Sequence, residues 1–587
     1  MGLLQKAVET YDANAALIGV YREGSDPLAP VCHTLTNANI EITLNQKGQF
    51  ISARKVDKSE SKILIPVTEE SAGRTSKGAK EHPHPLCDQL KYITADDNYY
   101  IPQLKKWLES QYSHPFLAPI LRYTETKSLA SELERHLGTV KEDDMICWRI
   151  NGIDGEEPAC WKNRNLFRAY IDYYLAQISD RDSALCMISG ETAPIAVQHP
   201  KGVIPINGNA KLISANDSSG FTYRGRFQKD WQAATIGYLA SQKAHNAIRW
   251  LASEQGVREF CGNRIFLCWN PEGIQIPRPM RRLRTADAEP IRQPSDYRQA
   301  LRSTLMSSRK DKQLKGTETA VLAALDAATT GRLALTYYNE IALDLFIERM
   351  EDWDARCCWY NGPFGIQAPH LMQITECAFG TPRGNFLETD DRIQRQHLQR
   401  LLNCKVGGGV FPLDIVKTLT QRASTPQAYD VKLWRKILHT ACSALQKYRY
   451  DTNRGGNEMA WELDKRDRSF QYGRLLAIME RGEMDYYSKT QENRQTNAIK
   501  FMSEYRQRPW FVFERVNRQL HQAYLNRIDP WQANRYERLV GEVTAILGGF
   551  PEEELNKPLE DIYLMGYELQ RNAFYSKKET DDKIAEE

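Results

Sequence analysis

The sequence predicts an α+β protein: a mixed α/β N-terminal region with short strands and loops, followed by an all-helical C-terminal bundle. In the first part of the chain, short apolar segments alternate with turns rich in Gly, Pro and Asn, which favours strands and loops. From about Asp391, apolar residues recur at helical spacing with Arg and Lys on the opposite faces. Because 587 residues exceed what one hydrophobic core supports, we expect roughly two to four domains. We place them at residues 1–275, 276–390 and 391–587.

The N-terminal segment is expected to open with a short helix at Met1–Tyr11. The alternating residues of Asn39–Val56 predict a hairpin that turns at Lys47-Gly48, and Ile63–Val67 predicts a further strand. Thr68–Pro85 contains glycines and prolines but no apolar period, so it predicts a loop.

This loop groups hydroxyl and cationic side chains of the kind that contact phosphates or base edges. An ordinary solvated loop is the alternative, because polar loops are common. The side chains in question are Arg74, Thr75, Ser76, Lys77 and Lys80.

The chain is organised around the stretch Leu185–Ala252. Its segments LCMIS and KLISA predict short strands, and Trp231–Leu251 has the apolar spacing of a helix. Between the strands lies a turn that an ordinary Asn-Gly hairpin would explain. Arg224, Arg226 and Lys229 form a basic cluster just before this helix. The simplest interpretation is that they are charged residues at the start of the helix.

The middle of the chain mixes irregular and regular segments. Asn270–Asp296 combines prolines and arginines without periodicity and predicts an extended crossing segment or linker. Val321–Tyr338 predicts strand, turn and strand around Thr330-Gly331, followed by a helix at Ile341–Asp352. Gly362–Gly380 is expected to be irregular.

The C-terminal helices carry an aromatic stripe and many arginines. Because the aromatic residues fall at helical spacing, we expect them in the core rather than as platforms for stacked bases. The stripe comprises Phe470, Tyr472, Tyr486, Trp510, Phe511, Phe513 and Trp531. The arginines fit either a solvated face or a nucleic-acid contact, and both interpretations remain open.

An ordered set of segments resembles the large subunit of the type I-C CRISPR Cascade effector (the Cas8 class), an RNA-guided DNA-binding complex. The set comprises Met1–Tyr11, Ile63–Ile93, the series SGE, PIA, HPKGV and LIS within Leu185–Ala252, Val321–Glu340 and Tyr472–Glu480. The resemblance runs essentially end to end. It implies a subunit that recognises the protospacer-adjacent motif in double-stranded DNA, helps open the duplex and stabilises the R-loop.

The resemblance also implies partners. These are the guide crRNA, the Cascade backbone and crRNA-end-binding subunits, target DNA, a small subunit from the same gene, and a helicase-nuclease that docks on the complex. The C-terminal bundle resembles that small subunit. Gly455-Gly456 can be encoded as a ribosome-binding sequence just before Met459, so we expect a second product that covers residues 459–587.

In this light the polar loops become candidate DNA contacts, since the minor groove is read by Lys, Asn, Ser or backbone glycine. The turn INGNAK is poorer in Gln and Ser than is common in the family, which leaves the reading residue open. The motif candidates are Arg74, Thr75, Ser76, Lys77, Asn207, Gly208, Asn209 and Lys211. The candidates for DNA-backbone contacts are Lys80, Arg224, Arg226, Lys229, Arg474, Arg481, Arg508 and Arg515.

The net charge and the motifs that the sequence lacks narrow the range of possible functions further. A net charge of +3 is too small for a general DNA-coating protein but allows local basic grooves. The twelve cysteines show no CxxC spacing, and no P-loop, HExxH or GxSxG motif is present. We therefore expect no metal, no cofactor and no enzymatic activity in a cytoplasmic protein without membrane segments. The alternatives are a nucleic-acid-modifying enzyme with an unrecognised site and a purely structural scaffold.

Overall fold

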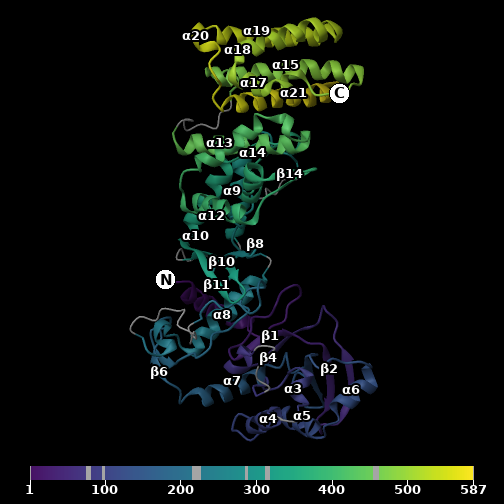
Figure 1. Ribbon diagram of the computed structural model, residues 1–587, viewed down its shortest axis with the longest axis vertical. Coiled ribbons are helices and arrows are strands. Elements are labelled where there is room, and N and C mark those ends of the chain that lie inside the picture. The colour runs from purple at the N-terminus through teal and green to yellow at the C-terminus, as the bar shows by residue number, and fades with distance from the viewer. Residues whose placement is uncertain are drawn as a thin grey trace. The chain divides into compact units, whose positions relative to one another are not determined.

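The computed structural model describes residues 2–74, 81–95, 99–214, 227–254, 256–283, 289–310, 318–453 and 462–585. The chain folds into two compact units, which Figure 1 shows in ribbon form. The first comprises Met1–Ile276 and Glu318–Ile341, and the second Pro277–Thr317 and Ala342–Glu587. The first unit combines sheets with helices and the C-terminal region is mainly helical, which confirms the predicted α+β class. In the described part of the chain, no helix is long and apolar enough to cross a bilayer.

The first unit contains a three-stranded sheet with β2 (Ile40–Asn45) at its centre. β3 (Phe50–Lys55) pairs with it antiparallel and β5 (Ile146–Asn151) parallel, so the predicted hairpin at Lys47-Gly48 is confirmed. Beside it, β1 and β4 form an antiparallel pair that supplies one wall of the site described below. The bounds of the remaining elements here are β1 (His33–Asn37), β4 (Lys62–Pro66), α2 (Glu69–Gly73), α3 (Leu90–Ile93), α4 (Tyr100–Leu108), α5 (Leu117–Glu125), α6 (Leu129–Leu137) and α7 (Arg164–Ile178).

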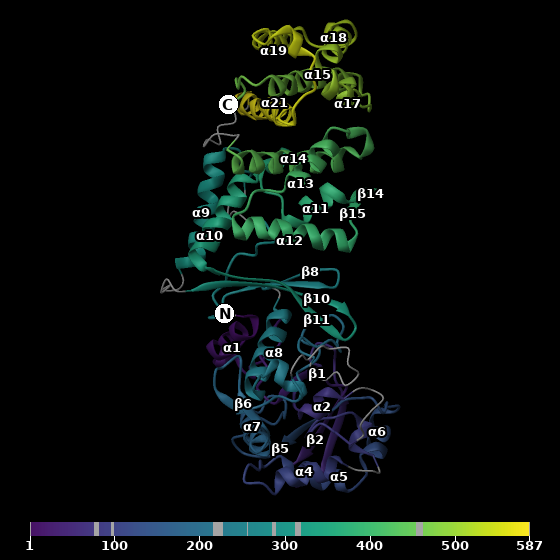
Figure 2. The same cartoon turned by 60° about the vertical axis from the view of Figure 1, so that its left-hand side comes forward.

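A second sheet in this unit has the order β11, β10, β9, β8. The predicted strand-turn-strand is confirmed as β10 (Thr319–Thr329) and β11 (Arg332–Ala342). Helices α1 (Leu3–Ala13) and α8 (Tyr238–Ser253) lie side by side on one face of this sheet, as Figure 2 shows. Their apolar residues share one core with the inner residues of β9 and β10. The two remaining strands are β8 (Arg258–Cys261) and β9 (Arg264–Trp269).

The organising stretch differs from its prediction in three places. A strand forms at β6 (Ser183–Leu185), paired with β7 (Thr192–Pro194), but the chain turns at Cys186, whose sulfur accepts backbone N–H groups of the turn. Lys211 makes only isolated bridges instead of a second strand. The helix begins at Tyr238 rather than Trp231, because Gly237 precedes it in an extended conformation.

In the second unit, the Arg- and Pro-rich segment is held in place where it is described. The Leu283 amide donates to the Asp354 carboxylate (2.6 Å), and the Lys405 ammonium donates both to Asp354 (2.8 Å) and to the Arg281 carbonyl (3.3 Å). The Lys405–Asp354 ion pair is fully buried. The prediction of an irregular Gly362–Gly380 is wrong, because the His370 ring caps the start of a helix, α11, within it.

The helical region is confirmed. The most extensive helix–helix packing in this region is between α15 (Arg468–Thr490) and α21 (Tyr563–Ala585). Gly473 and Gly566 let the two backbones approach closely. A Cβ at Gly473 would lie 1.9 Å from the Tyr563 carbonyl oxygen. The other helices are α9 (Pro294–Lys310), α10 (Leu343–Arg356), α11 (Leu371–Phe379), α12 (Asp391–Gly407), α13 (Leu413–Ala423), α14 (Val431–Asp451), α16 (Asn497–Lys500), α17 (Met502–Gln507), α18 (Pro509–Gln519), α19 (Pro530–Leu547) and α20 (Glu552–Leu555).

The aromatic stripe divides into three groups, of which Tyr486 and Trp510 form a half-buried one. Phe470, Tyr472 and Phe513 are buried, as predicted for core residues. Phe511 is 51% and Trp531 64% exposed, so the core prediction is wrong for these two. Helical spacing alone did not separate them, because each lies in the first turn of a helix that only partly faces the bundle.

Candidate nucleic-acid interface

A cavity of about 760 Å³ in the first unit brings together segments that lie far apart in the sequence. Its walls come from β1, the end of β4, the α2 and α3 region, the loop after Pro200 and one face of α8. Two of the predicted contact segments meet here, since both Arg74 and Gly208 line the cavity.

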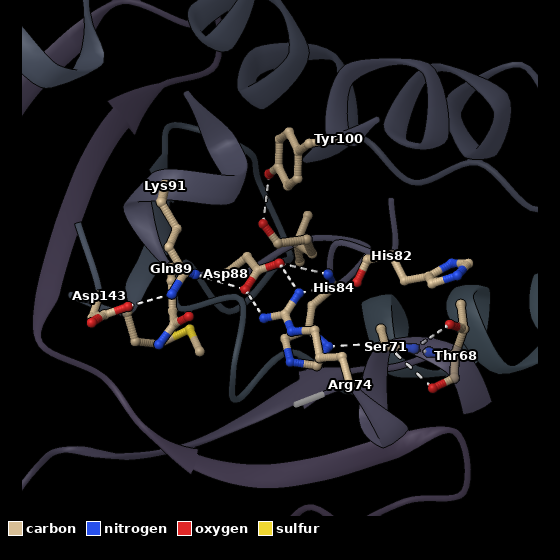
Figure 3. A network of polar contacts seen from close by, with 12 residues as sticks. Thr68, Ser71, Arg74, His82, His84, Asp88, Gln89, Lys91, Tyr100 and Asp143 are labelled. Carbon is tan, nitrogen blue, oxygen red and sulfur yellow. Dashed lines mark hydrogen bonds and ion pairs between the residues drawn. The ribbon is translucent and has the colours of Figure 1, made fainter. Parts of the chain in front are cut away.

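Arg74 follows α2, and its charge is neutralised within the protein. The guanidinium forms a two-pronged ion pair with the buried Asp88 carboxylate, one prong of which measures 2.7 Å. It also donates to the His82 carbonyl (3.0 Å) and lies 3.8 Å from the centre of the Tyr92 ring. Figure 3 shows Arg74 directed at Asp88 inside this network. Arg74 thus anchors the start of the predicted contact loop.

Two histidines of the cavity wall are neutral near pH 7. The His84 Nδ1 shares a hydrogen bond with the Ser71 hydroxyl (2.9 Å), and its backbone N–H donates to Asp88. Burial lowers the pKa of His84 to about 4. Burial likewise lowers the pKa of His33 on β1 to about 4. These rings offer hydrogen bonds without charge.

The segment between Lys201 and Lys211 is a closed loop with an exposed tip. Lys201 and Lys211 form an antiparallel bridge, and the Gly202 N–H donates to the Ala210 carbonyl (3.1 Å). Gly202 has a positive φ of 63°, and a Cβ there would lie 2.8 Å from the Gly208 carbonyl oxygen. Only glycine fits this position without strain. The tip of the loop, Asn207, Gly208 and Asn209, is exposed to solvent.

Lys201 joins the two predicted contact segments. Its ammonium donates to the Arg74 carbonyl (2.6 Å). Burial lowers the pKa of Lys201, and the neighbouring charges of Lys211 and Arg74 lower it further. Burial also lowers the pKa of Lys211. Cations are therefore concentrated at this side of the cavity.

Sequence reasoning missed the polar face of α8. Gln242, Asn246 and Arg249 all line the cavity. Their spacing of four and three residues places them on one helix face, which was the available signal. Arg249 donates to the carbonyls of Lys201 (3.0 Å) and Gly202 (3.3 Å), so it supports the closed loop directly.

Several predicted contacts do not join the cavity. Lys229 pairs with Asp182 (2.7 Å) and is not among the described residues that line it. Other predicted positions lie outside the residues that the structure describes. They are Thr75, Ser76, Lys77, Lys80, Arg224, Arg226 and Met459.

The four bundle arginines have different surroundings. Arg474 is only 5% exposed and donates to Gln570 (3.0 Å) and the Leu463 carbonyl (2.8 Å), so its guanidinium faces the interior. Arg481 pairs with Asp485 at 2.9 Å. Arg508 and Arg515 are exposed, and Arg515 lies over the Phe501 ring.

The described residues contain no group of three or more His, Cys, Asp or Glu side chains that could hold a metal ion. The cavity instead combines cations, neutral imidazoles and amides, which suits the recognition of an anionic, hydrogen-bonding partner.

Comparison with known proteins defines first a class and then a family. Residues 8–575, nearly the whole chain, match a model of CRISPR-associated proteins. That model is described as CRISPR-associated protein (Cas_Csd1), and the chain belongs to this family. It is therefore a CRISPR-associated effector subunit of the Cascade kind, in a family of structural subunits, which suggests a role other than catalysis. No curated protein matches the chain.

Proposed function

We propose that this chain is the large subunit of a type I-C Cascade effector and recognises the protospacer-adjacent motif at the cavity of the first unit. The observation that carries the proposal is the meeting of Arg74 and Gly208, at the tip of the 201–211 loop, in the lining of one cavity that also contains Lys201. In RNA-guided effectors, base pairing with the guide reads the target, while the protein reads only a short flanking motif.

The exposed tip at Asn207–Asn209 suits minor-groove reading. Amide groups of Asn can donate to the acceptors that A·T pairs present there, and Gly208 adds no side chain that would hinder approach. Entry of the loop at the first base step would help open the duplex, at about a few kcal/mol per unstacked step. Once the R-loop has formed, the protein would hold the displaced DNA strand. Arg508 and Arg515 are the exposed arginines of the bundle that could contact this strand.

The proposal includes the remaining partners. The chain would assemble with the guide crRNA, the backbone subunits and the crRNA-end-binding subunit, and the complex would provide the docking surface for the helicase-nuclease. A small subunit translated from Met459 would carry residues 459–587. Silent recoding of Gly455 and Gly456 should then reduce the C-terminal product in cells, and an unchanged amount would contradict internal translation.

The test of motif recognition is binding of the purified effector complex to duplexes that differ only in the flanking motif. Asn209→Ala should reduce the preference for the correct motif by about tenfold, because a good base contact discriminates by about 1–3 kcal/mol. Asn165→Ala, an exposed asparagine on α7 away from the cavity, is the matched control.

Loss of motif preference in the Asn209 variant alone supports recognition by this loop. Unchanged preference in that variant refutes this loop as the reader. Binding without any motif preference in the unmodified complex would instead favour a purely structural scaffold, and DNA cleavage by the purified chain with metal alone would favour an enzyme.

A further inference from the structure

The α8 wall of the cavity contains a cation that has no counter-ion in the described part of the chain. Arg249 has no carboxylate partner among the described residues. A guanidinium has five N–H donors, of which three are used here, by the carbonyls of Lys201 and Gly202 and by the Asn246 side chain (3.2 Å). Two donors remain, and the side chain lines the cavity.

A second side chain on the same wall lacks a partner. Gln242 lies seven residues before Arg249, two helical turns away on the same face of α8. It is 6% exposed, it lines the cavity, and its amide makes no hydrogen bond to the described residues. Its amide atoms are not among the described buried polar atoms that lack a partner, so the amide borders the open cavity and can bind an external group there.

Another part of the cavity wall differs. There Arg74 is paired with Asp88 and Lys91 with Asp143, so the cations of that wall already have carboxylate partners. The cavity therefore has one neutralised wall and one wall with unbalanced positive charge. Burial lowers the pKa of Arg249 to about 10, which leaves the group charged at pH 7.

We infer that the α8 wall is a phosphate-binding subsite, in which Arg249, Gln242 and Lys201 hold one phosphodiester of the target duplex. A phosphodiester carries a single negative charge and several acceptor oxygens, and it matches the paired donors of a guanidinium. The inference rests on the proposed function and deepens it. The tip at Asn207–Asn209 would read the motif, while the subsite would fix the position of the backbone without reading sequence.

The test uses the complete effector complex and duplex DNA over a series of salt concentrations. The main variants are Arg249→Gln, which removes the charge, and Gln242→Leu, which removes the free amide and breaks no hydrogen bond to the described residues. Lys91→Gln serves as the matched control, because it removes a cation of the same cavity that is already paired. Duplexes with single neutral methylphosphonate linkages near the motif form the second arm.

In the Arg249 variant we expect about tenfold weaker binding for every flanking sequence and a salt dependence shallower by about 0.9 in the slope of log K against log salt. Gln242→Leu should weaken binding about threefold or more without changing that slope, since it removes one hydrogen bond. One methylphosphonate position should weaken binding of the unmodified complex and have no further effect on the Arg249 variant.

The inference is overturned if Lys91→Gln lowers the slope as much as Arg249→Gln, if no methylphosphonate position loses its effect in the variant, or if only affinity for the guide RNA falls. Failure of the proposed function looks different. In that case motif preference is absent in the unmodified complex, while the Arg249 effect on the salt slope persists.

Discussion

The cavity of the first unit and the helical bundle of the second each contain an arginine that is largely withdrawn from solvent. In the bundle, Arg474 donates to two side chains and a carbonyl that pack around it, and nearby acidic groups partly offset the burial that lowers its pKa. In the cavity, Arg249 uses three donors on its own unit and keeps two beside open space.

This difference shows that an arginine in a nucleic-acid-associated protein is a ligand candidate only where its donors border accessible space. By sequence, Arg474 is a candidate for a DNA-backbone contact, whereas Arg249 lies in the helix predicted for Trp231–Leu251 and is not a candidate. In the structure, the Arg474 side chain faces the interior of the bundle, whereas Arg249 lines the cavity. Counting basic residues along helices does not separate the two cases, because the helix period is the same for both.

The largest expected effect lies in the second unit, where buried charges are paired. Lys405→Met leaves the Asp354 carboxylate buried without its cation. We expect the free energy of unfolding to fall by about 3–5 kcal/mol, as is typical when one partner of a buried pair is removed. Denaturant unfolding measures the change. Lys432→Met, the same substitution at an exposed position of α14, should stay within about 0.5 kcal/mol.

The next effect concerns the close helix contact of the bundle. Gly473→Ala places a methyl group against the Tyr563 carbonyl, so α15 and α21 must separate. A loss of about 1–3 kcal/mol or more is expected from overpacking. The control is Gly541→Ala on α19, where no atom of the described residues lies within 4 Å of the added carbon. That substitution should stabilise by up to about 1 kcal/mol, and equal losses at both glycines would refute the contact.

The stability of the folded protein should depend on pH through Glu483 on α15. Burial raises its pKa from 4.5 to about 7, although the backbone N–H groups of Asn497 and Ala498 donate to the carboxylate. Between these values the folded protein binds a proton that the unfolded chain has released. Stability should therefore fall as pH rises from 4.5 to 7, with a slope of up to about 1.4 kcal/mol per pH unit.

Glu483→Gln should remove this part of the slope. Chemical denaturation at several pH values measures it, and Glu514→Gln on the exposed face of α18 controls for the change in net charge. A slope that survives in the Glu483 variant would assign the pH dependence to other groups.

The smallest expected change in stability is the sharpest test of the difference between the cavity and the bundle. Gln242→Leu removes a buried amide that has no partner among the described residues, so stability should change by less than about 0.5 kcal/mol or rise slightly. Thermal unfolding of the variant checks this. A loss above about 2 kcal/mol would mean that Gln242 serves the interior of the first unit, as Arg474 serves the bundle.

Much of the fold was predictable because its signals are local. The hairpin at Lys47-Gly48 follows from alternation around its turn, the paired β10 and β11 follow from apolar runs on either side of Thr330-Gly331, and the bundle helices follow from their period. Where tertiary contacts decide, prediction was wrong. Lys211 has a strand-like sequence, but Lys201 and Arg332 bind its backbone in isolated bridges. α11 lacks a strong sequence signal and depends on the His370 cap.

For the candidate site, the loops were predictable from the sequence, but the cavity at which they meet was not. Arg74 and Gly208 are more than a hundred residues apart, and both line a cavity that also takes residues from β1 and α8. The Asp88 partner of Arg74 could not be inferred either, since no local spacing connects them. Whether the loop tips contact DNA stays a prediction.

The chain passes between the two units three times, at residues 276–277, 317–318 and 341–342. During synthesis, β9 therefore leaves the ribosome well before its neighbour β10, with a segment of the second unit emerging in between. Until the hairpin of β10 and β11 arrives, one edge of β9 has no partner. The first unit thus completes its sheet late, after part of the second has already emerged, and non-local pairing of this kind slows folding.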